Sequence, residues 1–183
     1  MSGRSGKLLA VGMLCLGLAA ALLSTAYRRA QTEQALAFWG AEQAATIATA
    51  PEVTALGFDP PLDENAAKMA DEIANRPGDR RARIERAEGF ATVRTLLIED
   101  GSFDWQTRFD QGPTEWPWGI AFAGGRGPTV VVLFDPVNRC VTKPHGRRWA
   151  RLTASAATQL KAFLEAQFPA ADGARQAEKA PAE

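Results

Sequence analysis

The sequence predicts an α+β domain: a small antiparallel meander of three to four strands with helices packed on one face, after one N-terminal transmembrane or signal helix. Large apolar residues recur with a period of two over residues 116–122, with small residues or proline between them, which is the pattern of a strand. A second run of β-branched and aromatic residues follows at 129–134. Residues 8–27 carry no charge and are long enough for a helix that crosses a bilayer.

The chain of 183 residues has room for one ordinary domain with short appendages. We expect a basic segment with the transmembrane or signal helix at 1–29, a globular α+β domain at 30–169 and a disordered tail at 170–183. Alanine and charged residues dominate the tail, so it can bury too little apolar surface to order itself.

The uncharged segment 8–27 has basic residues on both sides: Arg4 and Lys7 before it, Arg28 and Arg29 after it. Its length favours an uncleaved anchor, and the basic N-terminus favours a domain on the other side of the membrane. We therefore expect a single-pass membrane protein with the C-terminal domain outside the cytoplasm. The small residues at 24–26 leave open the alternative that the domain is exported after signal cleavage near Ala26. The membrane is therefore the first expected partner, and a protein partner is the second.

Helix and strand patterns alternate before the meander. Residues 30–49 predict a helix, because Leu36, Trp39 and Ile47 recur at roughly helical spacing, and residues 52–58 predict a short strand. The charged run at 79–88 is typical of a solvated helix face or loop. Residues 89–100 have apolar positions at helical spacing and predict a helix.

Between these elements, the two prolines after Asp59 indicate the start of another helix, because proline is tolerated in a first helical turn. Its apolar stripe would consist of Leu62, Ala66, Met69 and Ile73. Pro77-Gly78 would end it.

The meander continues through two turns, at 124–128 and 135–138, and a short returning strand at 139–142. A final helix follows, with Thr153 or Ser155 as its N-cap and Pro169 as its end. Its buried side would consist of Ala156, Leu160, Phe163, Leu164 and Phe168.

Lysine and arginine total 21, as do aspartate and glutamate, so bulk charge gives no reason to expect nucleic acid as a partner. Residues 139–151, the basic segment, are the local exception, with five positive charges and no acid. Its candidate binding residues are Lys143, His145, Arg147, Arg148 and Arg151. We expect a solvated loop here; the alternative is an anionic-surface binder, to which residues 80–86 could contribute.

The acidic stretch at 99–115 contains the candidate catalytic residues Asp100, Asp104 and Asp110. A calcium loop beginning at Asp100 fails, because the required glycine and glutamate are replaced by Trp105 and Gln111. Paired carboxylates would allow acid–base hydrolysis, but nothing in the spacing fixes two of them on one face. We therefore favour a polar loop that carries aromatic residues into the core.

Cysteine, histidine and glycine patterns suggest no cofactor and no metal site. His145 is the single histidine. Cys15 lies in the uncharged segment 8–27, whereas Cys140 lies far along the chain in the domain, so we predict no disulfide between them. A Cys140–His145 hydrolase is a remote alternative, because Cys140 falls in a predicted strand. The glycines at 124–127 lack the lysine and serine or threonine of a phosphate-binding loop.

A set of aromatic motifs is similar to one found in a loose group of uncharacterised bacterial proteins, membrane-anchored or exported. In that group a helix ends in a D-x-S-[FY]-D-W element, which is followed by a Trp/Phe strand and an LLFD-like strand. The matching residues here are Asp100, Ser102, Phe103, Asp104 and Trp105, then Trp118, Phe122 and 132–135. The resemblance implies no known activity.

Every catalytic template lacks a required residue in this sequence. We therefore expect an extracytoplasmic, membrane-anchored domain that is a non-catalytic binding or interaction module. A hydrolase that uses the acidic cluster around Asp104 is the enzyme alternative, and binding of an anionic surface through the basic segment is the third.

Overall fold

The computed structural model describes residues 31–63, 70–75, 79–106, 113, 115–124, 127–144 and 148–168, with residues 13, 18, 20, 23 and 24 before them. Within this described part, no helix is long and apolar enough to cross a membrane. Most of the uncharged segment 8–27 and all of the tail 170–183 lie outside the described residues, as do Asp110, His145 and Arg147.

The domain is α+β and is built on one six-stranded antiparallel sheet, larger than the three to four strands predicted. Its strand order is β2-β1-β3-β4-β5-β6. The strands are β1 (Glu52–Asp63), β2 (Arg80–Arg83), β3 (Glu115–Ala123), β4 (Val130–Asp135), β5 (Cys140–Thr142) and β6 (Trp149–Arg151). The predicted meander is confirmed as β3-β4-β5, in which Ile120 lies opposite Val132 and Phe134 opposite Val141.

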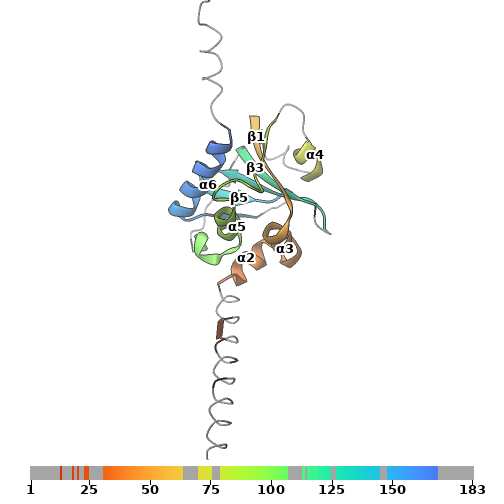
Figure 1. Cartoon of the computed structure of the whole chain (residues 1–183). Coiled ribbons are helices and arrows are strands. Elements are labelled where there is room, and N and C mark those ends of the chain that lie inside the picture. Colours follow the sequence, from red (N-terminus) through yellow and green to blue (C-terminus); the bar gives the residue numbers. More distant parts are fainter. Residues whose placement is uncertain are drawn as a thin grey trace, which may run out of the picture.

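Helices cover both faces of the sheet, not one face as predicted (Figure 1). On the first face lie α2 (Glu33–Trp39), α3 (Ala41–Thr49), α5 (Phe90–Ile98) and α6 (Ala154–Gln167), around a core that includes Trp39, Phe122 and Leu160. The short α4 (Ala70–Asn75) covers the second face, where Ile73 packs with residues such as Leu56 and Leu133. The reason is visible in β4, whose six residues are all buried, so it presents apolar side chains to both sides.

Helix α5 holds the α2–α3 pair against the sheet through polar contacts as well as apolar ones. The indole Nε1 of Trp39 donates to the carbonyl of Leu97 at 2.7 Å. The Arg94 guanidinium donates to the carbonyls of Ala48 and Ala50, where α3 ends, and lies over the ring of Phe90. The predicted helix at 30–49 is confirmed as two helices broken at Gly40, whose φ of 85° favours glycine.

The predicted helix start at Asp59 is wrong, because β1 continues through both prolines to Asp63. Leu62 lies opposite Trp116 in the sheet, and both side chains are buried in the second-face core. This burial outweighs the local preference of proline for a first helical turn. Only Ile73 of the predicted stripe lies on α4; Ala66 and Met69 fall outside the described residues.

Trp116 also departs from the prediction that four large side chains of β3 share one face. It belongs to the second-face core, whereas Trp118, Ile120 and Phe122 pack on the first face. At this end of β3, the pairing with β1 shifts register between Gly57 and Leu62.

Within the charged run 79–88, residues 80–83 form the edge strand β2, not the helix face or loop predicted for them, whereas residues 85–88 form a turn, in agreement with the predicted loop. Strand β6 was likewise expected as loop. The helices α5 and α6 are confirmed, and Thr153 caps α6 by accepting from the backbone N of Ala156 at 3.3 Å.

Candidate functional site

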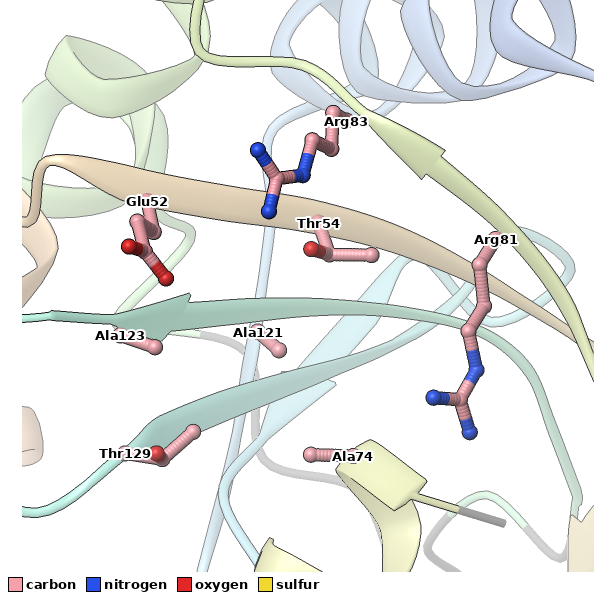
Figure 2. Close-up of a pocket in the computed structure, with 8 residues that line it drawn as sticks. All are labelled: Glu52, Thr54, Ala74, Arg81, Arg83, Ala121, Ala123 and Thr129. Atoms are coloured by element: carbon pink, nitrogen blue, oxygen red, sulfur yellow. The ribbon is translucent and has the colours of Figure 1, made fainter. Parts of the chain in front are cut away.

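A groove of about 380 Å³ opens on the second face of the sheet, beside α4 (Figure 2). We call it the arginine groove. Its lining side chains come from three neighbouring strands, from α4 and from the residue before β4: Glu52, Thr54, Ala74, Arg81, Arg83, Ala121, Ala123 and Thr129.

Strand register places these side chains together. Arg83 lies opposite Thr54, and Thr54 lies opposite Ala121 on the other side of β1, so the three share one face of the sheet. Arg81 is two residues before Arg83 and therefore points to the same face. The floor is low because Ala121 and Ala123 are small, and this leaves the groove open.

The groove carries two guanidinium groups and one carboxylate. Figure 2 shows Arg83 reaching over β1 toward Glu52 and Thr54, while Arg81 extends toward Ala74 on α4. Among the described residues, the exposed Arg83 guanidinium makes no hydrogen bond or ion pair. By contrast, the Arg80 guanidinium on the opposite face lies 5.5 Å from the Trp118 ring and 5.3 Å from the Phe168 ring.

This arrangement suits the binding of an anion. A guanidinium group offers a planar fork of donors that matches a carboxylate or a phosphate, and both arginines are held on a paired strand. Among the described residues that line it, the groove presents two arginines, one glutamate and the hydroxyls of Thr54 and Thr129. These groups suit the recognition of charge.

The two acidic candidates that the structure describes, Asp100 and Asp104, do not form a pair. Asp100 caps α2: its Oδ1 accepts from the backbone N of Ala35 at 2.6 Å and its Oδ2 from Gln34 at 3.0 Å. Asp104 lines a separate cavity of about 440 Å³ beside Trp105 and Arg139, and no other acid of the described chain lines it. Asp110 lies outside the described residues.

The basic candidates that the structure describes, Lys143, Arg148 and Arg151, lie on or beside the paired strands β5 and β6. The Lys143 Nζ donates to the carbonyl of Trp39 and to Oε1 of Gln43, both at 3.0 Å, so it caps the end of α2. Arg148 is exposed, and Arg151 is half-buried on β6. Strands β2 and β6 form opposite edges of the sheet, so the two arginine-rich segments are separated by four strands.

Cys140 is buried, and its thiol donates to the carbonyl of Asn138 at 3.3 Å. Burial, together with the negative charge of Asp135, raises the pKa of the Cys140 thiol to about 12. The thiol is therefore protonated at neutral pH, which makes it a poor nucleophile. The described residues contain no group of three potential metal ligands.

Sequence reasoning named residues 80–86 as a possible contributor to a basic surface, but it did not distinguish Arg81 and Arg83 within this run, because the run looks solvated. The available signal was their period of two, which is diagnostic only once a strand is assigned. In comparisons with protein families, curated proteins and solved structures, no match to this chain was found.

Proposed function

We propose that this protein is a non-catalytic binding module that holds an anionic group of its ligand in the arginine groove. The observation that carries this proposal is the pair of arginines, Arg81 and Arg83, on one face of β2 above a floor of small side chains. An anion between them would gain charge-assisted hydrogen bonds without displacing apolar side chains.

The uncharged segment 8–27 supports a further part of the proposal, in which the module is anchored in the membrane and its domain lies outside the cytoplasm. In this setting the ligand is presented at the membrane surface. Reporters fused after Glu183, active on only one side of the membrane, test this placement.

Titration calorimetry on the full-length protein in detergent tests the groove. The probes are an eight-residue peptide with glutamate at alternate positions and, separately, inorganic phosphate, which distinguishes a carboxylate from a phosphate ligand. We expect Arg83→Gln to weaken binding of the preferred probe by about tenfold or more, since it removes a charge-assisted contact of roughly 1.5–3 kcal/mol.

Arg86→Gln is the matched control, because Arg86 is exposed but does not line the groove. The Arg86→Gln protein should bind the preferred probe with the same affinity as the unchanged protein. Equal losses for both variants would indicate only general charge attraction, and the absence of binding to either probe would overturn the groove as an anion site.

The hydrolase alternative is supported by the cavity that places Asp104 near Arg139 and Trp105. If this cavity is catalytic, Asp104→Asn abolishes any detected turnover and leaves probe binding in the arginine groove unchanged. A turnover that survives this substitution excludes Asp104 as its acid or base.

A further inference from the structure

The two edge strands of the sheet, β6 and β2, differ in their backbone pairing. At the β6 edge, Phe103 forms an isolated β-bridge with Leu152, the Asp104 N–H donates to the Arg151 carbonyl at 2.8 Å, and Thr153 N–H donates to the Ser102 carbonyl at 2.9 Å. At the other edge, β2 pairs with β1, and no other strand of the described chain pairs with it. Among the strands that the structure describes, the edge with no further strand paired to it is therefore the one that carries the arginines, and we call it the open edge.

One hydrogen bond shows which residues of β2 direct their backbone N–H and C=O groups toward β1. The N–H of Ile84 donates to the carbonyl of Val53 at 2.9 Å, so Ile84 and Ala82 direct their backbone groups toward β1. Arg81 and Arg83 alternate with them and direct their N–H and C=O groups toward the open edge. The same two residues place their guanidinium groups in the groove.

Charge decides which strand can pair there. β2 contains three arginines in four residues. A second copy of this edge would bring like charges opposite one another, which destabilises cross-strand pairs. An acidic strand has the complementary charge, and its side chains at alternate positions repeat about every 6.5 Å, as do those of Arg81 and Arg83.

We propose that an acidic, extended peptide segment of a partner protein adds to β2 as a seventh strand, with acidic side chains at alternate positions reaching Arg81 and Arg83. This deepens the function proposed above and rests on it. Main-chain hydrogen bonds supply part of the affinity, and the two guanidinium groups select for the acidic pattern.

N-methylated peptides test strand addition with the full-length protein. The probe is again the eight-residue peptide with glutamate at alternate positions, compared with one version methylated on the glutamate amides and another methylated on the intervening amides. An added strand directs only every second amide toward β2, so one version should bind at least about tenfold more weakly and the other as well as the parent. If methylation of the glutamate amides lowers the affinity, the added strand is antiparallel to β2. If methylation of the intervening amides lowers the affinity, the added strand is parallel to β2.

Equal affinities for both methylated peptides overturn strand addition. If Arg83→Gln still weakens binding in that case, the groove remains an anion site, and only the edge pairing fails. If the parent peptide and phosphate both fail to bind, the proposed function itself fails.

Discussion

The carboxylate of Asp100 closes the N-terminus of α2, a helix far earlier in the chain: its Oδ1 lies 2.6 Å from the backbone N of Ala35, 65 residues before it. The backbone N–H of Asp100 in turn donates to the carbonyl of Gln31 at 2.7 Å. Thr32, the residue in the N-cap position of α2, makes no side-chain cap hydrogen bond, so a residue from a distant segment performs this role. These contacts fix the segment that leads from α5 to Asp104 against α2.

We predict that Asp100→Ala destabilises the domain by about 1–2 kcal/mol, because two N–H groups at the start of α2 lose a charged acceptor. Urea unfolding followed by tryptophan fluorescence measures the change. Glu88→Ala, at an exposed turn, is the control and should change stability little. A stable Asp100→Ala protein with altered ligand turnover would instead return Asp100 to the list of catalytic candidates.

Lys143→Met should destabilise the domain by about 1 kcal/mol, since the carbonyl of Trp39 at the end of α2 loses its charged donor. Arg148→Met is the matched change at an exposed position of the same basic segment and should leave stability unchanged. Thermal unfolding of the two variants makes the comparison. Equal melting temperatures would show that the Lys143 contact contributes nothing to stability.

The part of the fold that local sequence determines was predictable. Strand β3 has large apolar residues at alternate positions, and β4 is a run of β-branched and other large apolar residues. Helix α6 has a threonine cap followed by apolar residues at helical spacing. Each of these patterns lies within its own element. The prediction therefore did not depend on knowing which segments meet.

The part that long-range pairing determines was not predictable. Strand β2 has the sequence RRAR, which has little strand propensity, and it becomes a strand because Arg83 and Arg80 lie opposite Thr54 and Gly57 of β1. The arginine groove depends on the same register. Without it, Arg81 and Arg83 could not be distinguished from the other charged residues at 79–88.

The roles of the acidic candidates Asp100 and Asp104 also could not be predicted from the sequence. Asp100 and Asp104 are four residues apart, and the sequence does not show which of them meets solvent. In the structure the first binds backbone N–H groups of α2 and the second lines a cavity. Chemical type alone did not separate a helix cap from a cavity residue.

Gly119 on β3 is predicted to be intolerant of a methyl group. A Cβ there would lie 3.0 Å from Cζ of Phe58, a buried ring on the second face. Gly119→Ala should therefore destabilise the domain by about 1–3 kcal/mol through overpacking. Gly101→Ala is the control, because a Cβ at Gly101 has no neighbour within 4 Å; urea unfolding should show it to be neutral or slightly stabilised. Equal stability of the two variants would mean that the Phe58 ring moves aside without loss.

The stability of the domain should fall at alkaline pH through Cys140. Its pKa is about 12 in the folded chain, because burial disfavours the thiolate, against an ordinary value of 9.0. The unfolded chain thus loses the thiol proton first, so the contribution of the neutral thiol to stability is fully present below about pH 9 and is lost as the pH rises toward 12. We expect the free energy of unfolding to decrease more steeply above pH 9 in a Cys15→Ser protein than in Cys15→Ser with Cys140→Ala. Urea unfolding between pH 7 and pH 10.5 measures both slopes, and subtraction removes the titration of lysine and tyrosine, which the two proteins share. Parallel profiles would show that Cys140 ionises as readily in the folded chain as in the unfolded one.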